Sequence, residues 1–477
     1  MTQTGSRTAK PEEQSHALRL SPFDVLMLLD ERPGYPMCFF IETQLSGDFS
    51  IHRFQDAVNV AVEQHPRLRS CARYSQQGWQ WVPSNELPQV IELELMANQD
   101  LQAIAFRPFD IRREPGIRFI VVPEGVQQWS IILQVHHSVC DGLAALEFLG
   151  DVWSLYHGSA PRPFRSKVEP KSDQLRTAKD SNKHVQEEHQ HLRETISFAT
   201  FRPSCVASSR AASTHREQEP HPDQRPFQSF TLTPIHVQRL RQHASQSGAT
   251  INDIIVAASI LAIHEWNTKQ SKPKNRIRIT MPVNLRPPRS RQPASNQIGY
   301  AFLDRHPNQL QEPHETIKSI AEASRWIQHS GAAGMFLIAL GFFLKRTWLL
   351  RLITRLPLCF STAVVSNIGN VQGRMRANVP KKDGRNTPGG LTITNMRGVP
   401  PVRPGTALSV GITNYCNQLT ITTMTDSRQS IKFAPFIRRR KPGYPNGSQP
   451  SRPRKKILKI EGKRSTPRTR PSKSRPR

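Results

Sequence analysis

The sequence HHSVCDG, at His136–Gly142, decides how this chain is interpreted. It follows a short apolar run, Trp129–Val135, whose length and composition are typical of a buried strand. After it, apolar residues recur at helical spacing from Leu143 to Tyr156, and Gly158 stands just past the end of that pattern. The sequence therefore predicts a loop between a strand and a helix, where α/β proteins commonly carry functional residues.

The residue types in this loop favour proton transfer. Adjacent side chains on an extended backbone point to opposite sides, so at most one of the two histidines faces a given pocket. A neutral imidazole can take a proton from an alcohol or amine near neutral pH. Asp141 is placed to turn back beneath the loop and pair with an arginine, and Gly142 permits a sharp turn and leaves room for a substrate. A histidine pair alone is usually structural, but the whole HHxxxDG pattern arises by chance on the order of one time in a thousand.

Charge is concentrated at the C-terminal end of the chain. The sequence has 66 Lys and Arg against 37 Asp and Glu, a formal net charge of +29. Residues 438–477 contain 16 of these basic residues and one acidic residue, Glu461, a net charge of +15. Seven prolines fall in the same segment, so we expect a disordered basic tail. Tyr444 is its only aromatic residue, and no specific nucleic-acid partner is expected because base stacking needs aromatic side chains.

No cofactor or targeting segment is predicted. The six cysteines, at positions 38, 71, 140, 205, 359 and 416, have no metal-ligand spacing, so neither a metal site nor a disulfide scaffold is expected. The polar start lacks the apolar core of a signal peptide. The most apolar window, Gly331–Leu344, is shorter than the ~20 residues that span a bilayer, so a cytoplasmic location is expected. Nucleotide-binding, zinc-protease and serine-hydrolase motifs are absent.

Composition and apolar periodicity predict an α/β protein with mixed sheets. The expected segments are a polar leader (1–17), an N-terminal lobe (18–158), a polar linker (159–226) with one helix near 182–198, a C-terminal lobe (227–430) and the basic tail (431–477). Strands are expected at 37–45, 79–82, 117–122, 129–135, 227–232, 276–282, 363–366, 391–394, 407–413 and 418–423. Helices are expected at 51–65, 143–156, 234–246 and 251–266, and within 325–356.

HHSVCDG resembles the active-site motif of the CoA-dependent acyltransferase superfamily, which includes chloramphenicol acetyltransferase, condensation domains and wax ester synthase/diacylglycerol acyltransferases. Further similar stretches, in the expected order, are LSPFD (20–24), HPRLR (65–69), FRPFD (106–110), TIND (250–253), PVNLR (282–286), NQIGY (296–300) and VSNIG (365–369). The resemblance covers about 18–157 and 227–430. It implies two chloramphenicol acetyltransferase-like lobes that form a pseudo-dimer, with the active site between them.

The resemblance also implies roles for the motif residues. His137 would be the general base that deprotonates a hydroxyl or amine acceptor, and a hydroxyl is the expected acceptor of the two. The donor would be an acyl-CoA or an acyl-carrier-protein thioester. His136 would support the loop, and Asp141 would be structural. Arg286 is the first choice as the partner of Asp141, with Arg118 and Arg305 as alternatives. No covalent acyl-enzyme is implied, so Cys140 is interpreted as a packed spacer.

Substrate-binding roles are assigned to Gly142, Asn252, Asp253, Ser366 and Asn367. Asn252-Asp253 directly before an apolar helix has a second interpretation, because a helix cap has the same pattern.

Gly331–Leu356 is apolar nearly all round and carries Lys345, Arg346, Arg351 and Arg355. One interpretation is a buried helix pair with basic ends, and the other is a patch in peripheral contact with a membrane, which would suit a lipid-like substrate. After about Arg428 the sequence departs from the superfamily pattern. A non-catalytic relative that binds an acyl or carrier-protein partner is therefore the alternative hypothesis for function.

Overall fold

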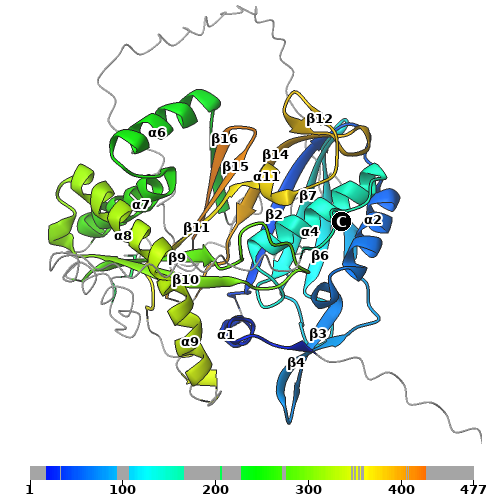
Figure 1. Cartoon of the computed structure of the whole chain (residues 1–477), viewed down its shortest axis with the longest axis horizontal. Helices are drawn as coiled ribbons and strands as arrows, with labels where there is room; N and C mark the ends of the chain where they lie inside the picture. The colour runs from blue at the N-terminus through cyan, green and yellow to red at the C-terminus, as the bar shows by residue number, and fades with distance from the viewer. Residues whose placement is uncertain are drawn as a thin grey trace, which may run out of the picture.

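The computed structural model (Figure 1) describes residues 18–425 with gaps. The gaps are 33, 94–106, 166–202, 204, 207–226, 271–274, 345–347, 349–350, 353–354, 356–358, 404 and 407. The predicted leader (1–17), nearly all of the predicted linker with its helix near 182–198, and the predicted tail (431–477) lie outside the described residues.

The first lobe is built on a mixed sheet with the strand order β14-β2-β7-β6-β5. The strand bounds are Thr392–Val399 (β14), Cys38–Ser46 (β2), Gln128–His136 (β7), Ile117–Gly125 (β6) and Gln89–Glu92 (β5). All neighbours pair antiparallel except β5 and β6, which are parallel. Strand β7 is central and buried along most of its length, which explains its nearly continuous apolar sequence.

Helices α2 (Ile51–Glu63) and α4 (Gly142–His157) pack against each other on this sheet (Figure 1). Their aromatic residues form the centre of the core. The ring of Phe54 meets Phe119 of β6 edge-on at 5.1 Å and Trp153 of α4 at 5.2 Å between centroids. Helix α4 begins directly after the HHSVCDG loop, so this core fixes the direction in which the loop leaves the sheet.

Three smaller elements surround the first sheet. Strands β1 (Leu18–Arg19), β4 (Gly78–Pro83) and β3 (Ser70–Ser75) form a separate antiparallel sheet. Helix α1 (Pro22–Asp30) begins at a capping box between Ser21 and Asp24, and the short 3-10 helix η1 spans Pro66–Arg69.

The second lobe contains a mixed sheet with the order β10-β9-β11-β15-β16-β8. Its strands are Ile298–Arg305 (β10), Ile277–Asn284 (β9), Ala363–Asn370 (β11), Leu408–Tyr415 (β15), Gln418–Thr425 (β16) and Phe227–Leu232 (β8). Strand β11 runs parallel to both of its neighbours, and the other pairs are antiparallel. Helices α6 (Pro234–Gln246), α7 (Ile251–Gln270) and α8 (Pro313–Ser330) accompany this sheet, with the 3-10 helix η5 (Pro307–Gln309) before α8.

A segment of the second half of the chain packs on the first lobe. Helix α11 (Val371–Met375) lies against α4, so closely that a Cβ at Gly150 would stand 1.8 Å from the Met375 carbonyl oxygen. The chain then passes through β12 (Lys381–Lys382), β13 (Arg385–Asn386) and the 3-10 helix η6 (Pro388–Gly390), and β14 pairs with β2. The sequence predicted a strand near 391–394 but not its place in the first sheet.

The predicted α/β class with mixed sheets is confirmed. Of the two interpretations of Gly331–Leu356, the buried helix pair is wrong for α9 (Ala332–Leu344). Helix α9 packs against β10 and α1 on one side. Its other side is open, because Ile338 is 66% and Phe342 68% exposed. Within the described ranges, no single helix has the length and apolar composition to cross a membrane, although two sharply bent helix pairs meet that test together.

Candidate active site

His137 directly follows β7 and is half-buried. Its backbone N–H donates to the Met37 carbonyl at 2.7 Å, which ties the loop to the start of β2. The ring lies between Phe23 and Phe39, at centroid distances of 5.6 and 5.2 Å. Burial lowers the pKa of His137 below its ordinary value, and the nearby Asp141 carboxylate only partly opposes this. The ring is therefore neutral at neutral pH and able to accept a proton.

His136 is fully buried and uses both ring nitrogens on protein groups. Its Nδ1 accepts the Ser138 backbone N–H at 3.2 Å and lies 2.6 Å from the Ser138 hydroxyl. Because Nδ1 accepts, the ring carries its proton on Nε2, which faces a Glu31 carboxylate oxygen at 3.3 Å. These contacts favour a supporting role for His136 in the loop.

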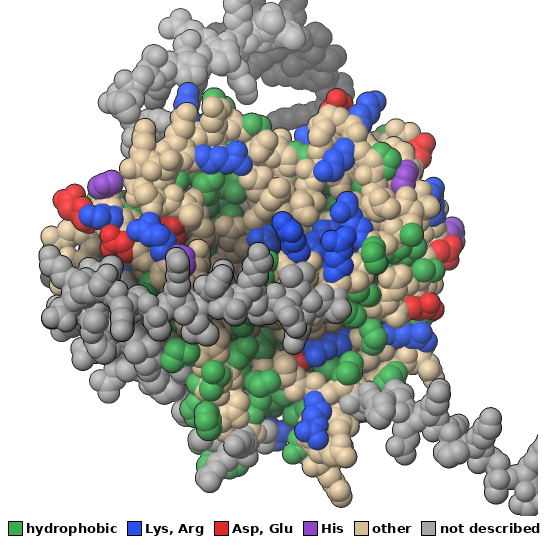
Figure 2. All heavy atoms as spheres, viewed as in Figure 1, with side chains coloured by type: hydrophobic (Ala, Val, Ile, Leu, Met, Phe, Trp, Pro, Cys, Tyr) green, Lys and Arg blue, Asp and Glu red, His purple; other side chains and the backbone are tan. Residues whose placement is uncertain are grey.

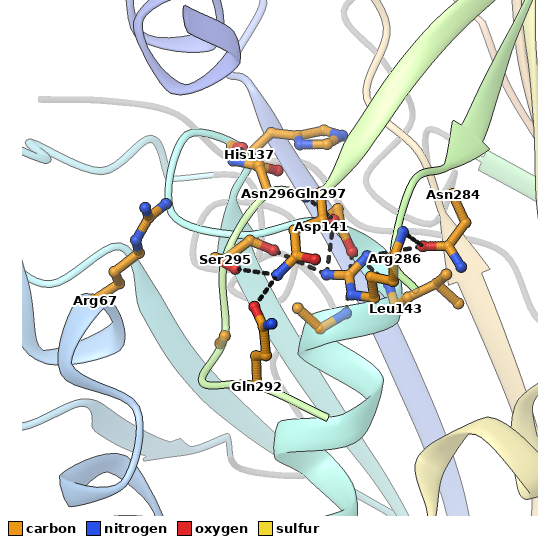
Figure 3. A network of polar contacts seen from close by, with 12 residues as sticks. Arg67, His137, Asp141, Leu143, Asn284, Arg286, Gln292, Ser295, Asn296 and Gln297 are labelled. Carbon is orange, nitrogen blue, oxygen red and sulfur yellow. Dashed lines mark hydrogen bonds and ion pairs between the residues drawn. The ribbon is translucent and has the colours of Figure 1, made fainter. Parts of the chain in front are cut away.

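Asp141 connects the loop to both lobes (Figure 3). One carboxylate oxygen caps helix α4 by accepting the backbone N–H groups of Leu143 and Ala144, each at 3.1 Å. The other oxygen accepts the Gln297 backbone N–H at 2.8 Å and lies 2.9 Å from the Arg286 guanidinium. Both oxygens of this buried carboxylate are thus engaged in structural contacts. This supports a structural role for Asp141 and not a direct contact with the substrate.

Of the three candidate arginines, Arg286 is the one that the structure brings to Asp141. Arg118 lies 3.7 Å from Glu114, and Arg305 donates to the hydroxyl and carbonyl of Ser319. Arg286 comes from the loop between β9 and β10, residues 285–297, which we call the bridging loop.

The bridging loop also supplies a residue that the sequence did not single out. The side-chain amide of Asn296 lies 2.9 and 3.1 Å from the carbonyl oxygens of His137 and Ser138, and 2.8 Å from a carboxylate oxygen of Asp24. Asp24 is buried at the start of α1 and pairs with Arg67 at 3.0 Å. Asn296 and Asp24 therefore hold the backbone of the HHSVCDG loop in place. Their signal in the sequence was only their place in the stretches NQIGY and LSPFD.

A second part of the bridging loop is anchored to α4 and η1. His65 accepts the Ala294 N–H at 2.9 Å through Nδ1 and faces Asp151 at 2.9 Å through Nε2. Asp151 in turn pairs with Arg291 of the bridging loop, and all three side chains of this network are buried. The bridging loop therefore has a fixed position relative to the HHSVCDG loop.

Four of the predicted substrate-binding residues lie in one neighbourhood. Gly142 faces β11, because a Cβ there would stand 3.4 Å from the Ile368 side chain. Next to Ile368, the Asn367 side chain donates to the Asn252 side chain at 3.1 Å. Ser366 precedes them on the same strand and is half-buried.

Asp253 makes local contacts. Its carboxylate accepts the backbone N–H and the hydroxyl of Thr250 at 2.8 and 2.7 Å, while Asp253 itself is buried. It is therefore a cap of helix α7, the structural alternative that the sequence had left open.

Cys140 is buried in the loop, and burial raises the pKa of its thiol well above the ordinary value. A protonated thiol is a poor nucleophile, so the chemistry of Cys140 favours its interpretation as a spacer. Across the described part of the chain, no three His, Cys, Asp or Glu side chains are grouped to hold a metal ion.

Two pockets lie beside the HHSVCDG loop, and each is lined by a residue that contacts a side chain of the loop. A pocket of about 420 Å³ includes Glu31, which faces His136. A pocket of about 240 Å³ includes Arg286, which pairs with Asp141. The lining residues of the larger pocket are Leu28, Leu29, Glu31, Phe109, Asp110, Ile111, Arg112, Arg351 and Arg355.

A strand–loop–helix site between two mixed α/β lobes, with a neutral histidine at its centre, is an arrangement suited to acyl transfer. The model of the condensation-domain family matches residues 34–300. This match covers more than half of the 477 residues, and the chain belongs to the condensation-domain family.

The relatives include both branches that the sequence had suggested. A Mycobacterium tuberculosis (strain ATCC 25618 / H37Rv) protein named "Putative diacyglycerol O-acyltransferase" is 24% identical over 356 residues, which cover 67% of this chain and 69% of that protein. The first condensation domain of the calcium-dependent antibiotic synthetase, solved with a substrate analogue, has a TM-score of 0.60 and 15% identity over 89% of this chain and 96% of that one. The wax ester synthase/diacylglycerol acyltransferase of Marinobacter aquaeolei VT8 has a TM-score of 0.52 and 17% identity over 88% and 97%.

These comparisons confirm the predicted superfamily and the predicted fold class. They place the chain in a family of acyltransferase-type enzymes that act on thioester donors and acceptors.

Proposed function

We propose that this protein transfers an acyl group from a pantetheine thioester, carried by CoA or by a carrier protein, to a hydroxyl or amine acceptor. The proposal rests on the different environments of the three ionisable motif residues in the HHSVCDG loop, His136, His137 and Asp141. Asp141 and His136 are buried in structural contacts, whereas His137 is partly exposed and neutral. His137 is therefore the one side chain of the motif that is free to exchange a proton with a substrate.

In this mechanism His137 acts as general base. It removes the proton of the acceptor, and the acceptor oxygen or nitrogen attacks the thioester carbonyl. The tetrahedral intermediate then collapses with cleavage of the carbon–sulfur bond, and the protonated His137 returns its proton to the leaving thiolate. The thioester is already activated, so positioning two substrates beside one base supplies most of the catalysis.

A hydroxyl of a lipid-like molecule is the acceptor we favour. The mycobacterial relative is named for O-acyl transfer to diacylglycerol. In addition, α9 presents Met335, Ile338 and Phe342 to solvent, and the exposed Arg351 and Arg355 follow it in the chain. An exposed apolar face with basic residues beside it is suited to peripheral contact with an anionic membrane. A panel of acceptors tests this choice.

Acceptor-dependent release of thiol is the expected result of the first assay. Acyl-CoAs from acetyl to palmitoyl are incubated with purified protein and with long-chain alcohols, diacylglycerol or amines, and free CoA thiol is followed over time. We expect release above the hydrolysis background only when an acceptor is present, with alcohols preferred to amines. Acylated holo carrier protein serves as a second donor in parallel. Absence of release with every donor and acceptor would instead favour a non-catalytic binding protein.

The pH dependence of kcat/KM is expected to report the lowered pKa of His137. A general base works only when neutral, so the rate rises with pH through the pKa of the free enzyme and then levels off. Because burial lowers this pKa, the midpoint of the acid limb should lie below 6.5, the ordinary value for histidine. A kcat/KM profile between pH 4.5 and 8 measures it. A midpoint above 6.5 would contradict the environment described for this ring.

A further inference from the structure

The 240 Å³ pocket beside Asp141 is lined by four arginines. Arg286 and Arg289 come from the bridging loop, and Arg374 and Arg376 come from α11 and its C-terminal end. The rest of the lining is Leu143, Glu147, Asn284, Pro287, Pro288, Ser290 and Gly373. Figure 2 shows Lys and Arg side chains gathered near the middle of the face viewed, over the region where the bridging loop meets α11 and the start of α4 in Figure 1.

Two of these arginines already have carboxylate partners. Arg286 pairs with Asp141 at 2.9 Å. Arg376 lies 3.6 Å from Glu147 and donates to the Ser290 carbonyl at 3.1 Å. Their positive charges are therefore largely balanced within the protein.

The other two arginines give the pocket its excess charge. Arg289 and Arg374 are exposed, and neither belongs to any ion pair found in the described ranges. Arg289 also has a positive φ of 62°, a backbone region that residues other than glycine rarely adopt. The pocket thus offers two exposed guanidinium groups outside these ion pairs, one from the bridging loop and one from α11.

Guanidinium groups from two segments that line one pocket are suited to a phosphate. Arginine binds phosphate oxygens through paired N–H donors, and two arginines supply the two positive charges that a phosphate monoester needs. The larger pocket differs, because it mixes its arginines with Glu31, Asp110 and apolar side chains. The carboxylates of the larger pocket offset its arginines, so its charge does not favour binding of an anion.

The position of the basic pocket indicates which substrate carries the phosphate. Leu143 of its lining is two residues from Asp141, and Arg286 contacts Asp141 directly, so the pocket adjoins the loop that presents His137. A phosphate bound there belongs to a molecule whose other end can reach His137. Both classes of thioester donor have this form, since a phosphate ester ends the pantetheine arm in CoA and in holo carrier proteins alike.

We propose that Arg289 and Arg374 bind the phosphate end of the pantetheine thioester donor. This inference rests on the proposed acyltransferase function, because that function requires a thioester donor. It places the phosphate of the donor in the pocket between the bridging loop and α11. The two arginines are positioning residues for binding, and they take no part in the proton transfer at His137.

Binding of unacylated ligands tests the proposal without requiring turnover. The full-length protein, an Arg289→Gln/Arg374→Gln double variant and a control Arg73→Gln are titrated calorimetrically with CoA, 4′-phosphopantetheine and pantetheine. Arg73 is an exposed arginine on β3, outside both pockets. Melting curves verify that all three proteins are folded. Each measurement is repeated in a His137→Ala background, so that binding and catalysis are scored separately.

We expect the Kd for CoA to rise roughly 10- to 100-fold in the double variant and to stay unchanged in Arg73→Gln, because two charge-assisted phosphate contacts are lost. The KM for acyl-CoA should rise in parallel. An equal loss for 4′-phosphopantetheine would show that the pantetheine phosphate itself is bound, as in a carrier-protein donor. A loss confined to CoA would overturn the proposal, because the two arginines would then bind the phosphates of the adenosine end and not the phosphate that ends the pantetheine arm.

Three further outcomes would overturn the proposal: equal CoA affinity in the wild type and the double variant, equal wild-type affinity for pantetheine and 4′-phosphopantetheine, or no CoA or 4′-phosphopantetheine binding by the wild type. If any of these accompanied acceptor-dependent thiol release, the acyltransferase function would stand and only this site would be rejected. If phosphate-dependent binding occurred without thiol release, the phosphate site would stand and the acyltransferase function would be rejected.

Discussion

A His137→Ala variant is expected to lose acyl transfer almost completely while keeping its fold. Removal of a general base typically lowers kcat by about 10²- to 10⁴-fold. His137 is half-buried, and its ring packs beside Phe23 and Phe39, so its loss should cost little stability. Thiol release at saturating donor and acceptor measures the rate, and thermal unfolding measures the fold.

Two other histidines serve as matched controls for this variant. His52→Ala removes an exposed histidine of α2 and should change neither rate nor stability. His136→Ala should lower both together, because His136 is buried between Ser138 and Glu31. A His137→Ala enzyme that retained near wild-type kcat would end the mechanism proposed here.

The sequence was most informative where the determinants of the site are local. Helix α4 follows β7 after a few residues, so the placement of the HHSVCDG loop could be predicted from apolar periodicity alone. The position of Asp141 at the N-terminus of α4 also follows from local pattern, since Asp is a preferred helix cap. Arg286 was one of three candidates, and the three could be separated only in three dimensions.

What the sequence could not supply are contacts between distant segments. Asn296 holds the HHSVCDG loop from 159 residues away, and it also binds Asp24, 272 residues away. Periodicity describes the face that a residue occupies on its own element and carries no information about which element lies opposite. The same limit explains β14, whose alternating apolar pattern predicts a strand but not its pairing with β2 across the lobes.

Composition was also insufficient to decide how α9 is used. A window as apolar as Ala332–Leu344 suggests complete burial, yet the helix buries Ala332, Ala333 and Leu340 and exposes Ile338 and Phe342. Helix α9 lies at an edge of the second lobe, where, among the described elements, α1, α8 and β10 contact it on one side. The exposed face is therefore a consequence of position, and the proposed membrane contact rests on it.

Asp141→Ala is expected to lower thermal stability together with activity. The substitution removes the cap of α4 and leaves Arg286 without its carboxylate, and breaking a buried ion pair costs about 3–5 kcal/mol. The melting temperature should fall by roughly 5–15 °C. Asp141→Asn keeps a capping oxygen but not the charge, so its melting temperature should lie between those of wild type and Asp141→Ala.

The matched control is Asp56→Ala, which removes an exposed carboxylate of α2 and should leave the melting curve unchanged. Combining Asp141→Ala with Arg286→Gln tests the pairing directly. If the two side chains act on each other, the double variant should lose less stability than the sum of the single losses. A melting curve of Asp141→Ala that matched the wild type would refute the structural role of this carboxylate. Asp141 would then have to act on the substrate, and the division of labour that makes His137 the only exchangeable group in the motif would no longer hold.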